Sequence, residues 1–167
     1  MVTFRLADSL PDNVVAKLAA DHRRMEADPV YRKKVEQYLD TGHGACWLRQ
    51  SEIAGCVKEC LHQFDGTRYC LHAYVLMPNH VHILCEVIPP FLLQKIIQTW
   101  KSYTARRINR LLSHDGPVWQ PEYWDRYIRD ELHYFDAWEY LLQNPVKAGL
   151  VDRPEDWNWT WARALPR

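Results

Sequence analysis

The chain has 167 residues, of which 47% are hydrophobic and 13% aromatic, so it suits one folded domain spanning residues 1–167 rather than a disordered chain. Its 21 basic and 21 acidic residues give a formal net charge of zero, which excludes a global electrostatic pull toward nucleic acid and leaves only local patches. It has no 18-residue apolar run, no signal peptide and no Cys-x-x-Cys pair, which argues against a membrane span and a cysteine zinc site and favours a cytoplasmic protein.

The first part of the chain predicts one strand followed by helices. Residues 2–6 form a short strand, and Ser9 is a candidate N-cap for a helix whose apolar stripe runs from Val14 to Ala19. Pro29 permits a second helical segment. A third helix is expected over residues 51–64.

Two apolar strands follow, over residues 69–77 and 80–87, joined by a tight Pro-Asn turn. His80 and His82 come directly after the turn. Alternate side chains of a strand point to the same face, so the two imidazoles project together. Such a pair supplies half of a metal site, while two ordinary strand histidines with local hydrogen bonds are the alternative.

The second half predicts a long amphipathic helix over residues 91–112 and a strand within the aromatic segment 119–128. A last helix runs from Glu131 to about Gln143, where Pro145 stops it. The tryptophans of the tail are spaced by two, which indicates an extended segment that covers part of the core. This order of elements matches a split βαβ pattern.

The pattern predicts an α+β, ferredoxin-like (RRM-like) fold, with an antiparallel sheet, helices on one face and a C-terminal helix. In that topology the strand carrying the two histidines is central. Its inner face packs on helices, and we expect its outer face to be open to a ligand.

The last helix offers a second group of candidate site residues. Helical spacing separates Tyr140 and Asn144, which are one turn apart, from an apolar stripe. We expect that stripe to consist of Tyr134, Phe135, Trp138, Leu141 and Leu142. The Asn144 amide oxygen can bind a hard divalent metal, and the Tyr140 phenol can attack a polarised phosphodiester. The residues alone favour the plainer alternative of a half-buried aromatic and a helix terminator.

Three motifs, in this order, resemble a known family. Residues 77–82 (Met-Pro-Asn-His-Val-His), 119–126 and 139–150 are similar to REP-associated tyrosine transposases, members of the insertion-sequence transposases with a His-hydrophobic-His motif. The similarity extends from about Val2 to Trp159. Members commonly have residues ahead of the first strand that read the foot of a hairpin, whereas here Met1 lies essentially within that strand.

The resemblance implies a transposase, a nuclease and strand transferase acting on single-stranded DNA at REP-like hairpins through a 5′-phosphotyrosine. It implies Tyr140 as the nucleophile and His80, His82 and Asn144 as ligands of a divalent metal, Mg²⁺ or Mn²⁺. The REP-associated branch tends to have asparagine at the last of these positions, where many other relatives have glutamine.

Basic side chains of the second half are the candidate phosphate contacts. They are Lys101, Arg106, Arg107, Arg110, Arg126, Arg129 and Lys147. We expect single-stranded DNA hairpins as partners, no membrane association, and a monomer or homodimer in the bacterial cytoplasm at the nucleoid. Two alternatives stay open: a non-catalytic nucleic-acid-binding module on the same scaffold, and a metal-dependent hydrolase of small phosphoesters.

Overall fold

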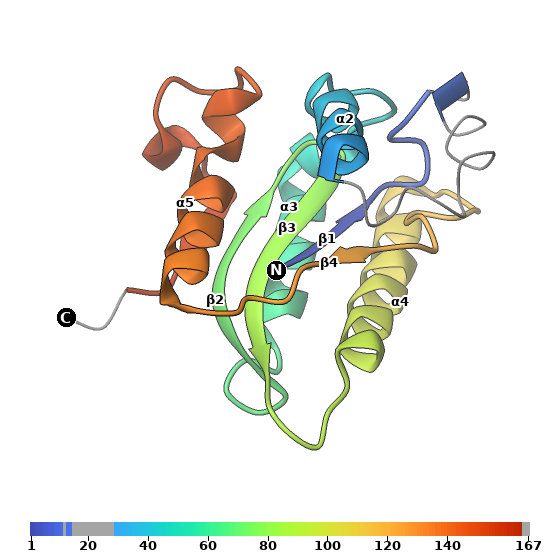
Figure 1. The fold of residues 1–167 in the computed structure, drawn as a ribbon. Helices are drawn as coiled ribbons and strands as arrows, with labels where there is room; N and C mark the ends of the chain where they lie inside the picture. The colour runs from blue at the N-terminus through green and yellow to red at the C-terminus, as the bar shows by residue number, and fades with distance from the viewer. Residues whose placement is uncertain (12, 15–28, 165–167) are drawn as a thin grey trace.

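The computed structural model describes residues 1–11, 13, 14 and 29–164. The predicted helix with the stripe from Val14 to Ala19 falls almost entirely outside these residues. The described strands form one antiparallel sheet in the order β4-β1-β3-β2-β5 (Figure 1). The strands are β1 (Val2–Arg5), β2 (Tyr69–Leu76), β3 (His80–Val87), β4 (Trp124–Asp125) and β5 (Thr160–Ala162). The predicted α+β fold with the histidine strand at its centre is confirmed.

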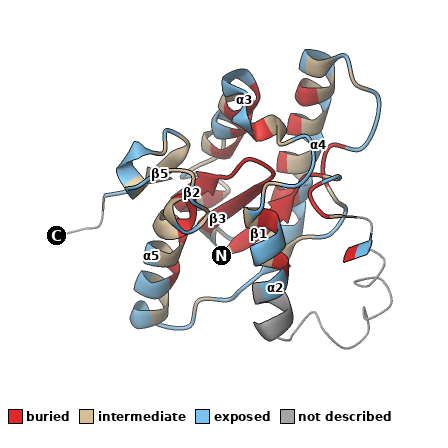
Figure 2. Ribbon diagram, turned by 90° about the horizontal axis from the view of Figure 1, so that it is seen from above, coloured by how far each residue is buried: buried red, intermediate tan, exposed pale blue. Residues whose placement is uncertain are grey.

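Helices cover both faces of the sheet. They are α2 (Pro29–Asp40), α3 (Ser51–His62), α4 (Leu93–Leu112) and α5 (Glu131–Lys147), with 3₁₀ turns at Trp47–Arg49 and Pro154–Asp156. Figure 2 shows α3 and α4 on one side of the sheet and α5 and α2 on the other. None of the helices within the described ranges has the length and apolar character needed to cross a bilayer.

The alternation of side chains along β2 and β3 creates two separate apolar clusters. Tyr74 and Ile83 join the main core with α3 and α4, while Val75 and Leu84 join a smaller cluster with Leu141 of α5. The outer face of β3 is therefore covered by α5, and the expectation of an open outer face was wrong. Covering this face brings α5 to the same side as the histidines.

Helix α5 is longer than predicted because its proline is tolerated inside the helix. Pro145 has no N–H to donate to the Leu141 carbonyl, which normally breaks a helix. Here the Asn144 side-chain amide donates to the carbonyls of Tyr140 (2.9 Å) and Leu141 (3.4 Å), so the Leu141 carbonyl keeps a partner. The helix ends instead at Lys147, and Gly149, two residues later, has a φ of +67° and takes part in a Schellman-type cap with hydrogen bonds to the Val146 and Pro145 carbonyls.

The apolar stripe expected on α5 was also partly wrong. Phe135 is 41% exposed, and Asn144 is buried together with Ala137 and Leu141. The side of α5 that faces the sheet is therefore rotated toward Asn144. This rotation is set by packing on β2 and β3 rather than by the hydrophobicity of the helix alone.

The strand expected within residues 119–128 is reduced to two residues by a tethered loop. The Lys101 ammonium donates to the carbonyls of Gln120, Pro121 (2.8 Å) and Glu122 (3.3 Å). These carbonyls are therefore held by α4 and take no part in a strand ladder. Trp124 and Asp125 pair with β1, and Trp119 forms an isolated bridge with Leu6 just after that strand.

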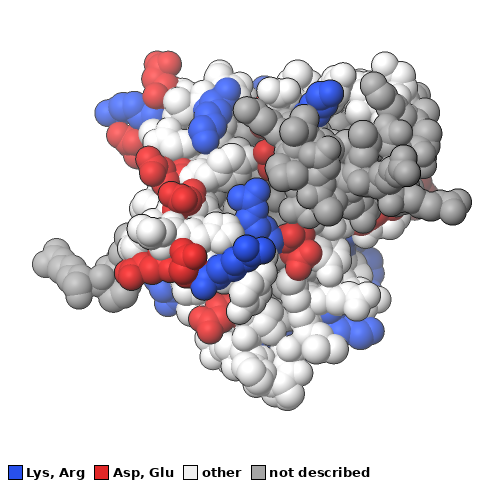
Figure 3. Space-filling view, viewed as in Figure 1, with Lys and Arg blue, Asp and Glu red and all other residues white. Residues whose placement is uncertain are grey.

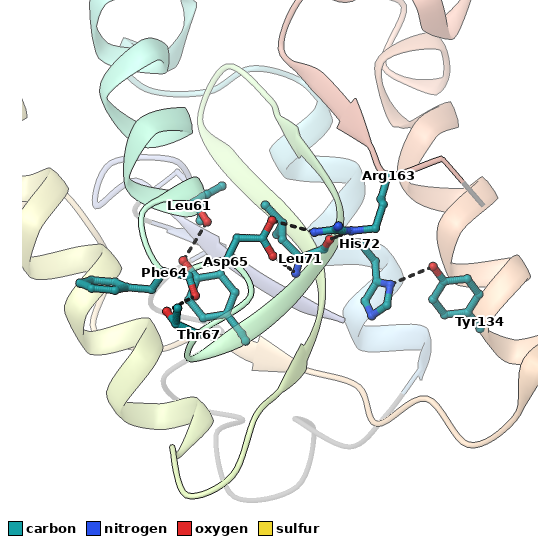
Figure 4. A network of polar contacts seen from close by, with 9 residues as sticks. Leu61, Phe64, Asp65, Thr67, Leu71, His72, Tyr134 and Arg163 are labelled. Carbon is teal, nitrogen blue, oxygen red and sulfur yellow. Dashed lines mark hydrogen bonds and ion pairs between the residues drawn. The ribbon is translucent and has the colours of Figure 1, made fainter. Parts of the chain in front are cut away.

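The extended tail segment is confirmed as β5, which pairs with β2, and a polar network fixes it there (Figure 4). Arg163 donates to the Asp65 carboxylate (2.7 Å) and to the Leu71 carbonyl (2.9 Å). At the adjacent bulge in β2, the His72 ring hydrogen-bonds with the Tyr134 hydroxyl at 3.2 Å. The first turn of α5 is thereby anchored on β2, two turns before Tyr140.

Candidate active site

His80 and His82 form a buried pair on the face of β3 that α5 covers. Their side chains are 1% and 0% exposed, and their Nε2 atoms are 3.0 Å apart. The two rings are perpendicular. The predicted projection of both imidazoles to one face is confirmed, and their Nε2 atoms meet at one point.

Asn79 determines which nitrogen of His80 carries hydrogen. The Asn79 amide nitrogen donates to the His43 carbonyl at 3.0 Å, so its amide oxygen is turned toward His80 Nδ1, at 2.8 Å. An amide oxygen only accepts, so Nδ1 of His80 must donate and its Nε2 keeps a lone pair. Gly44 positions the loop that supplies the His43 carbonyl, since a side chain there would come within 2.5 Å of the Asp8 carbonyl oxygen.

Thr3 has the corresponding contact with His82. It lies directly opposite His82 in the β1–β3 ladder, and its hydroxyl is 2.8 Å from His82 Nδ1. A hydroxyl can donate or accept. When Thr3 donates, His82 Nε2 carries hydrogen and donates to His80; when Thr3 accepts, both Nε2 lone pairs point at the same place.

The pair has the dimensions of two neighbouring ligands of an octahedral cation. Two nitrogens at right angles, each about 2.1 Å from a metal, lie about 3.0 Å apart, which is the observed Nε2 separation. Hydrogen bonds to the outer nitrogens are the usual support of metal-bound histidines. Among the described residues, no cluster of three or more His, Cys, Asp or Glu side chains forms a metal site, so any further ligand here is of another type.

Burial keeps both imidazoles neutral. It lowers the pKa of His82 to about 4 and the pKa of His80 well below its ordinary value, which the neighbouring His82 lowers further. Neutral imidazole is the form that binds metals. The two imidazoles are therefore in the protonation state that metal coordination requires at neutral pH.

The lowered pKa of His82 predicts that the protein loses stability in mild acid. His82 takes up a proton near pH 6.5 in the unfolded chain and only near pH 4 in the folded chain. The stability present at neutral pH therefore falls as the pH drops through this range. We expect a loss of about 2 kcal/mol from His82 between pH 7 and pH 5. Urea unfolding with a chelator present measures it.

The comparison with His82→Gln isolates this contribution. Asp40 has a pKa raised to about 6, chiefly by burial, so it favours the folded state as the pH falls and opposes the histidines. Subtracting the pH dependence of the unfolding free energy of His82→Gln from that of wild type removes the contribution of Asp40. If the unfolding free energies of wild type and His82→Gln changed equally with pH between pH 7 and pH 5, the prediction would be contradicted.

Tyr140 reaches the histidine pair from α5. Its ring is 6.1 Å from the His82 ring, centroid to centroid, although the two residues are far apart in the sequence. Burial raises the pKa of the Tyr140 phenol well above its ordinary value, and the Glu36 and Asp40 carboxylates of α2 raise it further, while Arg126 lowers it. The phenol is therefore neutral and needs activation to act as a nucleophile.

Asn144 lies one turn after Tyr140 on the buried side of α5. It is 2% exposed, and its amide nitrogen is used in the helix, by the carbonyls of Tyr140 and Leu141. These bonds turn the amide nitrogen toward the helix backbone and leave the oxygen as the group able to bind a cation.

The residues predicted to contact DNA differ in their side-chain partners and in their exposure. Lys101 is engaged by three backbone carbonyls, which gives it a structural role. Arg107 is paired with Glu59 at 2.8 Å, and the Lys147 ammonium lies 4.5 Å from the centre of the Tyr140 ring. The other four, Arg106, Arg110, Arg126 and Arg129, are exposed. Figure 3 shows basic and acidic side chains interspersed over the face that it draws, in line with the zero net charge.

Four residues of the site were not predicted from the sequence: Thr3, Glu36, Asp40 and Asn79. Asn79 carried a signal, because it precedes a histidine in a tight turn. The other three lie on β1 and α2, and their proximity to Tyr140 and His82 depends on tertiary packing.

Comparison with known proteins gives a consistent result. The family model described as "Transposase IS200 like" matches residues 47–131, about half of the chain, a segment that includes both histidines and ends at the start of α5. A REP-associated tyrosine transposase of Escherichia coli K12 is 29% identical over 90 residues, covering 52% of this chain and 50% of the relative. A Haemophilus influenzae protein assigned to the same group is 26% identical over 98 residues, covering 53% and 56%.

The chain thus spans about half the length of the curated relatives that it matches. A solved structure of a REP-associated tyrosine transposase bound to a REP hairpin is 17% identical. It superimposes with a TM-score of 0.56 and covers 95% of this chain and 73% of that one. The structural likeness shows that the two proteins share a fold.

Proposed function

Because this chain belongs to the IS200-like transposase family, we propose that it cuts and rejoins single-stranded DNA with Tyr140 as the nucleophile. The convergence of the Tyr140 ring on the buried histidine pair supports this proposal most strongly. A phenol beside two lone pairs that face one point is an arrangement suited to attack on a phosphodiester. The enzyme would be a metal-dependent endonuclease and strand transferase.

In the proposed reaction, the Tyr140 oxygen forms a bond to phosphorus and the bond from phosphorus to the 3′ oxygen breaks. The product is a 5′-phosphotyrosine and a free 3′-hydroxyl. Attack by a 3′-hydroxyl on the same phosphorus reverses the step and joins strands.

His80, His82 and Asn144 would hold the divalent cation. When bound, the cation polarises the phosphate and offsets the charge that develops on it. The amide oxygen suits Mg²⁺ or Mn²⁺, and the two imidazoles favour Mn²⁺ of these two. Thr3 and Asn79 keep the two rings in the binding orientation.

The proposed substrate is a single strand that carries a REP-like hairpin. The solved relative with the same fold is bound to such a hairpin. Arg126 lies close enough to Tyr140 to lower the pKa of its phenol, which makes this arginine the best-placed contact for the reacting phosphate. Arg129 and the arginines of α4 would contact the backbone further away.

The test is covalent capture. The protein is incubated with hairpin-bearing single strands, labelled at either end, with Mn²⁺, Mg²⁺ or chelator, and run on a denaturing gel. We expect a protein–DNA adduct with Mn²⁺ that carries the label from the 3′ side of the cut and disappears with chelator.

Two other results would replace the proposal. Hairpin binding that is insensitive to chelator, with no adduct on any strand, would indicate a non-catalytic binding module. Turnover of bis(p-nitrophenyl) phosphate without an adduct would indicate a phosphoester hydrolase.

A further inference from the structure

Tyr127 is a large aromatic residue that the fold leaves in solvent, with a side chain that is 83% exposed. It lies in the segment that leads from β4 to α5 across the sheet (Figure 1). Single exposed aromatic residues are common on protein surfaces and need no explanation by themselves. What distinguishes Tyr127 is the rigidity of its backbone, the groove beside it and the charges on either side of it.

The backbone before and after Tyr127 is held in place. Arg126 donates its N–H to the Met1 carbonyl at 2.8 Å, which continues the pairing of β1 with β4. Ile128 packs on the apolar cluster between the sheet and α5, and the Asp130 side chain caps that helix. The ring of Tyr127 is therefore presented on a fixed segment, so a partner can bind it with little loss of backbone freedom.

A groove with a volume of about 530 Å³ runs beside this segment. It is lined by residues 84–87 of β3, by the start of β1 and by residues 125–128, so Tyr127 stands at its wall. Its volume is within the range of pockets that hold small molecules. The groove can therefore take one nucleobase with its sugar.

The groove adjoins a narrower cleft that reaches the histidine pair. The cleft has a volume of about 30 Å³ and is lined by Thr3, whose hydroxyl contacts His82. The cleft and the groove share three lining residues, one of which is Arg126. A strand with a phosphate at the histidine pair can thus pass Arg126 and bring its next base to Tyr127.

The side chains along the segment match the repeat of a single strand of nucleic acid. The exposed guanidinium groups of Arg126 and Arg129 flank the Tyr127 ring in the sequence. Proteins bind single strands with cations that follow the backbone and aromatic rings on which bases stack. The groove also contains Glu86 and Asp125, so its lining has no excess of positive charge. Such a lining suits a neutral base better than a phosphate.

We propose that Tyr127 stacks on the unpaired base next to the phosphate held at Arg126 and seats that base in the groove. The inference rests on the proposed function, because it requires a single strand at the histidine pair. Tyr127 takes no part in the chemistry and is a positioning residue. By fixing one base, it fixes the register of the strand and so determines which phosphodiester is cut.

The test is a double-mutant cycle between protein and DNA. Single strands with a REP hairpin carry an abasic site at successive positions of the unpaired flank, and fluorescence anisotropy with chelator measures each Kd without cutting. We expect Tyr127→Ala to raise the Kd of the intact strand by about 10-fold, and one abasic position to do the same to wild type. At that position the two changes together should exceed either one by less than about 2-fold, because each removes the same contact.

Two variants control for the loss of the ring. Tyr127→Phe keeps the stacking surface, so its Kd should stay within about 3-fold of wild type. Leu132→Ala removes a side chain that is 79% exposed and does not line the groove, and it should match wild type. With Mn²⁺, the labelled fragments released by Tyr127→Ala should show cuts at more than one phosphate, whereas wild type cuts at one.

The outcomes separate this inference from the proposed function. Independent effects of Tyr127→Ala and of every abasic position overturn the stacking role, while the proposed function stands if wild type forms its adduct. Coupling at one position without an adduct supports the stacking role and overturns the proposed chemistry. Loss of a dimer in Tyr127→Ala by analytical ultracentrifugation, without coupling to any base, would make the ring a contact between copies and overturn the inference. Failure of wild type to bind any strand overturns both.

Discussion

Replacing Tyr140 with phenylalanine is expected to abolish the covalent protein–DNA adduct, by at least about 10⁴-fold in rate. The substitution removes one oxygen atom and keeps the ring that contacts His82. The fold and the affinity for the strand should therefore be nearly unchanged. Denaturing gels measure the adduct, and fluorescence anisotropy measures the affinity.

Tyr134→Phe is the matched control for this prediction. Tyr134 is on the same helix, but its hydroxyl hydrogen-bonds with His72 at the bulge in β2. We expect its adduct rate to stay within about 3-fold of wild type, because the bond anchors α5 without reaching the site. An adduct formed by the Tyr140→Phe protein would show that another residue is the nucleophile.

The second large effect is expected from His80→Ala. Without one of the two facing nitrogens, Mn²⁺ affinity should fall by at least about 100-fold and the adduct rate by about 10³-fold. The Asn79 amide oxygen also loses its partner, which should cost about 1–3 kcal/mol of stability. Electron paramagnetic resonance of Mn²⁺ measures the affinity, and urea unfolding measures the stability.

Thr3→Val provides a graded comparison, since it keeps both imidazoles and nearly the same volume. It removes the hydroxyl that contacts His82 Nδ1. We expect Mn²⁺ affinity to fall by about 10–100-fold, between wild type and His80→Ala. If His80→Ala retained metal-dependent adduct formation at the wild-type rate, the histidine pair would have no part in the reaction.

The sequence contained the local part of this site. The two histidines could be predicted to share a face because the side-chain period of a strand is two and the Pro-Asn turn marks where β3 begins. Tyr140 and Asn144 could be placed one turn apart by helical spacing alone. That Tyr140 would lie beside His82 followed from the family resemblance, not from the pattern itself.

The remaining part depends on packing between distant segments. Thr3 meets His82 only because of the register between β1 and β3, which the order of elements does not specify. Phe135 is more hydrophobic than Asn144, so hydrophobicity alone gave α5 the wrong rotation. The end of α5 was misplaced because the proline rule took no account of a side-chain amide that replaces the missing backbone donor.

The contacts of the two outer ring nitrogens have a consequence for the chemistry of cation uptake. Most histidine sites shed protons to the solvent when they bind a metal. Here both rings are neutral beforehand, and the single hydrogen between them can move to Nδ1 of His82 while the Thr3 hydroxyl turns from donor to acceptor. The pair can thus exchange an internal hydrogen bond for a cation with no net release of acid. The affinity of the histidine pair for the cation should be independent of pH near neutrality, and the heat of cation binding should not depend on the choice of buffer.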